Sequence, residues 1–340
     1  MLALGSCAPS PHGQTAHKQP KIVSLNPCTD AILAEVADPE QLLAISAYSR
    51  DPASSSMDLG VAKRWPATNG TVEEVLALRP DVVVSGTYTP ASTRAAFAGL
   101  GLRLEELPIA ATVAESKAQV RQLAALAGHA DRGEAMVARI EAALEAAKPP
   151  TDTVPISAVV WQSGGIVAGD GTLIADLLRR TGFSNLAAAR GLGQAQVLPL
   201  ERMLADPPQV ILAAGNAGAQ ENRMLRHQAL ATLRNTQRVK LDSSLLWCGG
   251  PTIVKAAARL AEIRDSQFAG PPPPTPPLKR RGVLSARSFP PLLFRGGGRG
   301  VVDILTRPGT VQRPAPTPLR LGSKLPSLVA PPLKRRGVQE

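Results

Sequence analysis

Short apolar runs alternate with amphipathic segments along most of the chain. The first run, residues 21–25, precedes a helical pattern that begins near Asp30 and places Ile32, Leu33 and Val36 on one face. Alternation of this kind predicts an α/β fold with mostly parallel sheets. Further strand-like runs are at 42–46, 81–85, 102–107, 156–161, 209–214 and 238–241. Further helical patterns are at 71–79, 91–99, 172–181, 200–206, 222–234 and 252–264.

The middle of the chain differs from both flanks. Residues 113–148 consist almost entirely of helix formers, with Gly128 as the one break, and Pro149 and Pro150 close the segment. A long helix between two α/β halves predicts a stiff connection. We therefore expect two lobes that rock by a modest angle and do not swing far.

The two halves repeat one pattern. Residues 72–84 and 200–212 each contain an apolar residue, a glutamate, a short helix closed by proline, and then a buried strand. The repeat places one first-turn glutamate in each half, Glu73 and Glu201.

Charge separates the body of the chain from its last seventy residues. Residues 1–270 hold 25 Lys/Arg and 25 Asp/Glu, so the net charge of +11 belongs to residues 271–340, which also hold 15 of the 32 prolines. Such a composition predicts disorder. Its repeated Pro-Pro-Leu-Lys-Arg-Arg-Gly-Val, at 276–283 and 331–338, fits a tether to nucleic acid or lipid, or a translated repetitive element. The neutral body itself gives no indication of a nucleic-acid partner.

The N-terminus contains a lipoprotein-like pattern. Leu4, Gly5 and Ser6 precede Cys7 as small residues precede the lipidated cysteine of an exported bacterial lipoprotein, and residues 8–20 look like a flexible tether. The six residues before Cys7 are too few for a working signal peptide. Either the true start lies upstream, with Cys7 as a lipidation site, or the match is due to chance. No apolar run reaches the length of a membrane span.

Several ordered motifs between residues 21 and 264 resemble the periplasmic binding proteins for cobalamin, haem and ferric siderophores, above all the cobalamin-binding members. The motifs are residues 22–27 with Thr29, residues 47–52, Glu73 through Asp81, Glu201 through Gln209, and Trp247 with Pro251. The resemblance implies two Rossmann-like lobes joined by a long rigid helix, which is the class III periplasmic binding protein fold. It also implies a monomer without cofactor that delivers its ligand to an ABC permease and ATPase at the inner membrane.

By this resemblance, Glu73 and Glu201 match the two glutamates that meet permease arginines. One carboxylate on each lobe would form a two-point ionic latch whose spacing reports lobe closure. Acids in a first turn also simply complement the helix dipole. A capping box predicted between Thr71 and Glu74 leaves Glu73 without a capping role.

Four residues are candidates for the ligand pocket. Tyr48 matches a ligand-contacting tyrosine of the family, and the neighbouring Arg50 could meet an anionic ligand group or lie free in solvent. Trp161 and Trp247 lie at strand ends or loops, where open α/β sheets form their ligand crevice, and core packing is the alternative for both. Residues 67–70 lack a tryptophan of the cobalamin-binding relatives, so a corrinoid precursor, haem or a ferric siderophore stays open.

Cys28 and Cys248 both lie in loops that lead into helices. With Cys7 assigned to lipidation they form an even pair, which suits one disulfide in an exported protein. Two alternatives stay open, a thiolate ligand at the cleft and two unpaired buried cysteines, because the sequence does not show how close the two residues are.

Enzymatic motifs are not evident. His129 and His227 have no ligand-spaced partner, His12 and His17 lie in the N-terminal segment, and no phosphate-binding glycine loop follows a strand. We therefore expect no catalytic residue and no metal site.

The resulting hypothesis is a periplasmic, lipid-anchored binding component of an ABC importer that captures a cobalamin, corrinoid or ferric-siderophore type ligand between its lobes. The alternatives are an α/β enzyme or metallocluster-binding protein that uses Cys28 and Cys248, and a nonfunctional truncated product. The expected segments are a tether at 1–20, lobe 1 at 21–112, a helical bridge at 113–150, lobe 2 at 151–268 and a disordered tail at 269–340.

Overall fold

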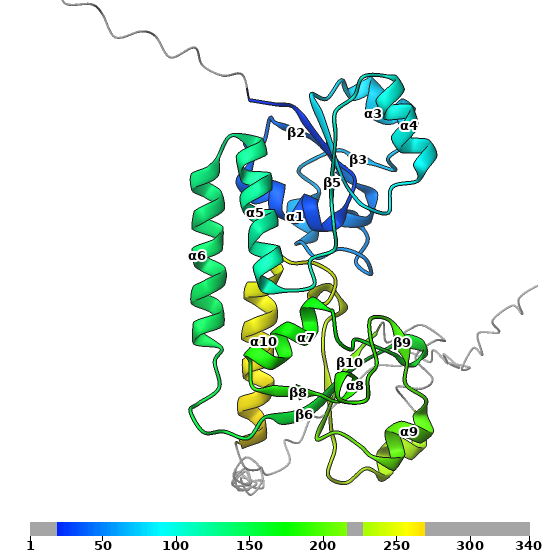
Figure 1. Ribbon diagram of the computed structural model, residues 1–340, viewed down its shortest axis with the longest axis vertical. Coiled ribbons are helices and arrows are strands. Elements are labelled where there is room, and N and C mark those ends of the chain that lie inside the picture. Colours follow the sequence, from blue (N-terminus) through cyan, green and yellow to red (C-terminus); the bar gives the residue numbers. More distant parts are fainter. Residues whose placement is uncertain (1–18, 216–226, 269–340) are drawn as a thin grey trace, which may run out of the picture. The chain divides into compact units, whose positions relative to one another are not determined.

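The computed structural model describes residues 19–215 and 227–268. The N-terminal segment with Cys7, the predicted tail and part of the helical pattern at 222–234 lie outside this range. The described residues form two α/β lobes and a helical bridge, all within one compact unit (Figure 1).

In the described part of lobe 1, five parallel strands pair in the order β3-β2-β1-β4-β5. The chain therefore turns outward in opposite directions from β1 and β4, which creates a topological switch point between these two strands. The strands are β1 (Ile22–Ser24), β2 (Leu42–Ser46), β3 (Ala67–Thr68), β4 (Val82–Gly86) and β5 (Leu104–Leu107). The helices are α1 (Pro27–Val36), η1 (Ala47–Arg50), α2 (Leu59–Ala62), α3 (Val72–Leu78) and α4 (Ala91–Gly99).

The described residues of lobe 2 form a mixed sheet. Strands β11, β10 and β6 pair in parallel, and β8 also pairs in parallel with β6. Strand β7 pairs antiparallel with β6, and β9 pairs antiparallel with β7. The strands are β6 (Ile156–Gln162), β7 (Ile166–Val167), β8 (Phe183–Asn185), β9 (Gln196–Val197), β10 (Val210–Ala214) and β11 (Gln237–Lys240). The helices are η2 (Ser163–Gly165), α7 (Leu173–Arg180), α8 (Leu186–Ala189), α9 (Leu200–Ala205), η4 (Gln228–Thr232), η5 (Ser243–Leu245) and α10 (Thr252–Phe268).

The bridge consists of two helices, α5 (Val113–Ala127) and α6 (Ala130–Ala146), which pack side by side as a hairpin (Figure 1). The prediction of one long helix was wrong in this respect. Gly128 takes a left-handed backbone (φ +81°), which ends α5 as glycine commonly ends helices. The close approach of the hairpin depends on Gly133, since a Cβ there would lie 2.5 Å from the Cβ of Ala124.

The central strands of both sheets are buried on both faces, and one core extends through both lobes. Residues of β1 and β4 and of β6 and β10 contribute to this shared core together with α1, α5, α6, α7 and α10. The opposite face of each sheet has its own smaller core, which α3 and α4 cover in lobe 1 and α8 and α9 in lobe 2. The central strands therefore appear in the sequence as continuous apolar runs and not as alternating patterns.

Candidate ligand-binding cleft

A cavity of about 450 Å³ opens between the lobes. Its lobe 1 wall follows β1 and β4, which is the switch point where open α/β sheets bind ligands. Lobe 1 and α5 contribute Asn26, Cys28, Thr29, Gly86, Thr87, Tyr88, Leu107, Pro108, Ile109, Ala110 and Gln119. Lobe 2 contributes Gln162, Ile166, Ala168, Thr172, Leu173, Ile174, Gln194, Ala195, Leu246, Trp247 and Gly249.

The described lining contains no Asp, Glu, Lys, Arg or His. Apolar side chains form most of the wall, and amide or hydroxyl groups are placed among them. One exposed aromatic comes from each lobe: Tyr88 is 81% exposed and Trp247 is 52% exposed. This lining suits a large, largely uncharged ligand with hydrogen-bonding amides or hydroxyls.

A disulfide joins Cys28, in the first turn of α1, to Cys248, which precedes α10. Their Cα atoms are 4.9 Å apart, although 220 positions separate them in the sequence. The sequence left three alternatives for these cysteines, a disulfide, a thiolate ligand and two unpaired cysteines, and the structure contains the disulfide. It links lobe 1 to lobe 2 beside the cavity, since Cys28 and Trp247 both line the wall.

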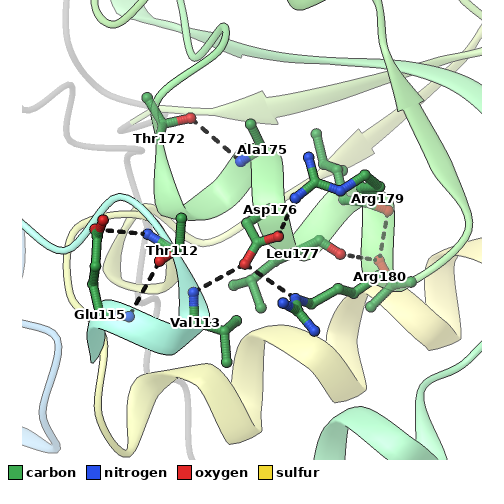
Figure 2. Close-up of polar contacts among 11 residues, drawn as sticks. Thr112, Val113, Glu115, Thr172, Ala175, Asp176, Leu177, Arg179 and Arg180 are labelled. Atoms are coloured by element: carbon green, nitrogen blue, oxygen red, sulfur yellow. Dashed lines mark hydrogen bonds and ion pairs between the residues drawn. The ribbon is translucent and has the colours of Figure 1, made fainter. Parts of the chain in front are cut away.

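Buried polar contacts hold the same joint. The Asp176 carboxylate of α7 accepts a hydrogen bond of 2.9 Å from the backbone N–H of Val113, the first residue of α5, and it also pairs with Arg179 and Arg180 (Figure 2). The Ser116 hydroxyl accepts a hydrogen bond of 2.8 Å from the N–H of Gly250. The bridge helix is thus bonded to lobe 2 at its first two turns.

Asp30 is a buried carboxyl two residues after Cys28. It accepts hydrogen bonds from the Ser46 N–H (2.9 Å) and from the Ser49 hydroxyl (2.7 Å), and so ties α1 to the short helix η1 that carries Tyr48. Burial raises the pKa of Asp30 to about 8, against the opposing effect of hydrogen bonds from Ser24, Ser49 and Ser46.

Of the four pocket candidates, only Trp247 lines the cavity. Trp161 has no exposed surface and packs in the separate core of lobe 2, because it faces the opposite side of β6 from Val160. The interpretation of Trp161 as a pocket residue was therefore wrong, and its alternative, core packing, describes it.

Tyr48 and Arg50 lie on η1, after β2, and neither lines the cavity. Tyr48 is 65% exposed, and the Arg50 guanidinium donates to the carbonyl of Trp65. The placement of these two residues in the pocket is not supported, since β2 lies beside β1 on the side away from the switch point.

Glu73 and Glu201 are both exposed, and within the described residues neither carboxylate has a hydrogen-bond or ion-pair partner. They lie in the first turns of α3 and α9, and both helices cover the sheet faces away from the shared core. The capping box predicted between Thr71 and Glu74 is only half formed. The backbone N–H of Glu74 donates a hydrogen bond to the Thr71 hydroxyl, but the Glu74 carboxylate accepts hydrogen bonds from the Thr68 hydroxyl and the Asn69 N–H.

Sequence reasoning missed Tyr88 and the amide side chains of the cavity, among them Asn26 and Gln162. Asn26 and Tyr88 follow β1 and β4, and Gln162 is the last residue of β6; the apolar runs predicted all three strands. The available indication was position: residues at or just after the carboxyl ends of β1, β4 and β6 face the crevice in such sheets.

Two lobes, a short helical bridge and a cleft between them define the class of two-domain binding proteins. Residues 22–245 match the family model "Periplasmic binding protein", and the chain belongs to this family of non-enzymatic substrate-binding proteins of ABC transporters. Comparison with curated proteins gives no match. Among the described residues, no helix is long and apolar enough to cross a bilayer.

Solved structures share the fold at low sequence identity. The periplasmic heme-binding protein RhuT from Roseiflexus sp. RS-1 is 20% identical, with a TM-score of 0.59 over 74% of this chain and 98% of that one. The vitamin B12 binding protein BtuF of Vibrio cholerae is 19% identical, with a TM-score of 0.57 over 73% and 98%. CeuE of Helicobacter pylori with Ni(II) bound is 20% identical, with a TM-score of 0.57 over 72% and 82%.

Proposed function

We propose that this protein captures a cobalamin or related corrinoid in the interlobe cavity and delivers it to an ABC permease. The observation that carries the proposal is the chemistry of the described lining. It combines apolar side chains, two exposed aromatics and several amides with no ionisable carboxylate, ammonium, guanidinium or imidazole. A corrinoid presents a broad ring with peripheral amides, which such a wall can cover and hydrogen-bond.

Anionic ligands fit this wall less well. A ferric siderophore with carboxylate or catecholate groups, or the two propionates of haem, would enter a cleft whose described walls offer no cation to pair with them. Burying an unpaired carboxylate costs several kcal/mol, on the order of the penalties seen for buried ions. Amide and hydroxyl lining residues impose no such penalty on a neutral amide-bearing ligand.

Haem is the second candidate, and one observation favours it. The Tyr88 phenol is exposed at the cavity wall, where it could ligate iron. Titration with haemin separates the candidates, since ligation by a phenolate changes the visible spectrum of haemin and Tyr88→Phe would abolish that change.

The test is a thermal-shift screen of the purified protein with cyanocobalamin, dicyanocobinamide, haemin and a ferric siderophore, followed by calorimetric titration of any hit. A ligand that binds only the folded state raises the melting temperature. A shift with the corrinoids alone supports the proposal. No shift with either corrinoid, alongside a clear shift with another ligand, would reject it.

Trp247→Ala should weaken corrinoid binding by about 10- to 100-fold, as expected for removal of a central aromatic contact. Trp247 is a cavity residue with much of its indole still exposed for contact. Calorimetric titration measures the change. Tyr48→Ala is the matched control, because Tyr48 is a similarly exposed aromatic that does not line the cavity. Equal losses for both variants would argue against this cavity as the site.

Docking to the permease is proposed for Glu73 and Glu201. Support comes from their exposure, their lack of partners among the described residues and their equivalent positions in the two lobes. The double variant Glu73→Arg with Glu201→Arg should reduce ligand uptake into reconstituted vesicles by at least about tenfold, through charge repulsion at the interface. Ligand affinity should stay unchanged.

Glu40→Arg provides the control for this experiment. Glu40 is an exposed glutamate in the turn between α1 and β2, outside the proposed docking helices. Normal uptake by the double variant at Glu73 and Glu201 would contradict the docking proposal while leaving ligand capture untouched.

Periplasmic export with lipid anchoring at Cys7 is part of the same proposal. It is supported by the pattern Leu4-Gly5-Ser6-Cys7 and by membership in a family of periplasmic binding proteins. Sequencing of the DNA upstream of Met1 tests it, because an in-frame basic and apolar stretch there would encode a signal peptide.

A further inference from the structure

We infer that the Cys28–Cys248 disulfide is a positioning device for ligand capture, which holds Trp247 of lobe 2 against the lobe 1 wall of the cavity. The inference rests on the proposed role of the cavity. It concerns residues 247–250, which lie in the connection between η5 and α10 and bring Trp247 and Gly249 to the cavity wall.

The first part of the argument is how this segment is attached. Cys248 is bonded to Cys28 in lobe 1, and the Cys28 sulfur lies 3.5 Å from the carbonyl oxygen of Trp247. The Gly250 N–H donates a hydrogen bond to the Ser116 hydroxyl of the bridge helix α5. Trp247, Cys248 and Gly250 thus each contact lobe 1 or the bridge.

The attachment is also close. A Cβ on Gly249 would lie 2.1 Å from the Ser116 hydroxyl oxygen, and a Cβ on Gly250 would lie 2.6 Å from Ile32. Only glycine permits this approach of the backbone to α5 and α1. The two glycines and the disulfide therefore place the segment against lobe 1 as a unit.

The indole of Trp247 has no comparable support of its own. It is half-exposed, and within the described residues its N–H has no hydrogen-bond partner. The backbone that carries the indole therefore sets its position in the cleft. A contact residue held in place before the ligand arrives loses less entropy on binding, which raises affinity.

The first experiment needs no ligand. Trp65 and Trp161 are buried, at 5% and 0% exposure, so acrylamide quenching and fast anisotropy decay report mainly on Trp247. Subtraction of the Trp247→Phe signal isolates it. Breaking the disulfide, by a phosphine reductant or as Cys28→Ser with Cys248→Ser, should increase quenching and lower the residual anisotropy while far-UV circular dichroism stays unchanged.

If the Cys28→Ser with Cys248→Ser variant fails to fold, Ser116→Ala gives a second test that leaves the disulfide intact. It removes the acceptor for the Gly250 N–H and should cause a smaller change in the same direction. An indole whose quenching and anisotropy are unchanged in the folded, thiol-titrated reduced protein would overturn the inference.

A second experiment tests the link to capture, with cyanocobalamin as the probe. Reduction should weaken binding about tenfold when Trp247 is present, and should have no further effect in the Trp247→Ala background. Equal losses in both backgrounds would show that the disulfide acts independently of Trp247 and would overturn the inference. If no redox state binds the probe, the corrinoid proposal fails, and the indole measurements still decide the positioning role.

Discussion

Replacing Asp176 with alanine should lower the free energy of unfolding by about 2–4 kcal/mol. The side chain is 4% exposed, and its loss leaves the buried N–H of Val113 without an acceptor at the start of the bridge (Figure 2). It also removes a carboxylate shared by Arg179 and Arg180. Urea unfolding monitored by circular dichroism gives the value.

The matched control for this experiment is Arg179→Ala. Its side chain is 71% exposed, so its ion pair with Asp176 should contribute less than about 1 kcal/mol. If Asp176→Ala costs as little as the control, the Val113 N–H must find another acceptor and the joint does not depend on this carboxylate.

The stability of the protein should fall as pH rises from about 4 to about 8, and Asp30→Asn should remove this dependence. The folded carboxyl has a pKa of about 8, well above the ordinary value of 3.8, because it is buried. Over the interval between these values the folded state retains a proton that the unfolded state has released, so each step up in pH favours unfolding. The total effect is on the order of 5 kcal/mol at about 1.4 kcal/mol per pKa unit.

The asparagine at position 30 mimics the protonated acid and can still accept from Ser46 and Ser49. It should match the wild type at about pH 4 and be the more stable of the two at pH 9, as measured by urea unfolding across this range. Asp51→Asn is the control, since hydrogen bonds from Ala53 and Ser54 lower the pKa of that exposed carboxyl and keep it ionised throughout. Parallel curves for the wild type and Asp30→Asn would contradict the prediction.

The fold was predictable because buried parallel strands leave a direct trace in the sequence. The apolar runs at 42–46, 81–85 and 209–214 correspond to β2, β4 and β10. Two-residue strands such as β3, β7 and β9 left no such trace, since they are too short to show a pattern. The bridge was predicted as one helix because composition alone does not reveal that Gly128 is left-handed, although glycine was visible there as the one break.

The site was less predictable, because side-chain direction depends on a one-residue register. Trp161 and Gln162 are adjacent, yet the tryptophan enters the lobe 2 core and the glutamine reaches the cavity. Trp247 could be proposed from its loop position. Tyr88 required knowledge of which strands flank the switch point, which comes from sheet order and not from local pattern.

The core shared by both lobes has a consequence for how the molecule can be divided. Helices α1, α5, α6, α7 and α10 contribute side chains to one apolar cluster. A fragment that ends near residue 150 would therefore expose a large apolar surface to solvent. We expect such a half-molecule to aggregate when it is expressed alone. The clusters beneath α3 and α9 each belong to a single sheet, so insertions there should disturb one lobe only, although they would lie on the helices that carry Glu73 and Glu201.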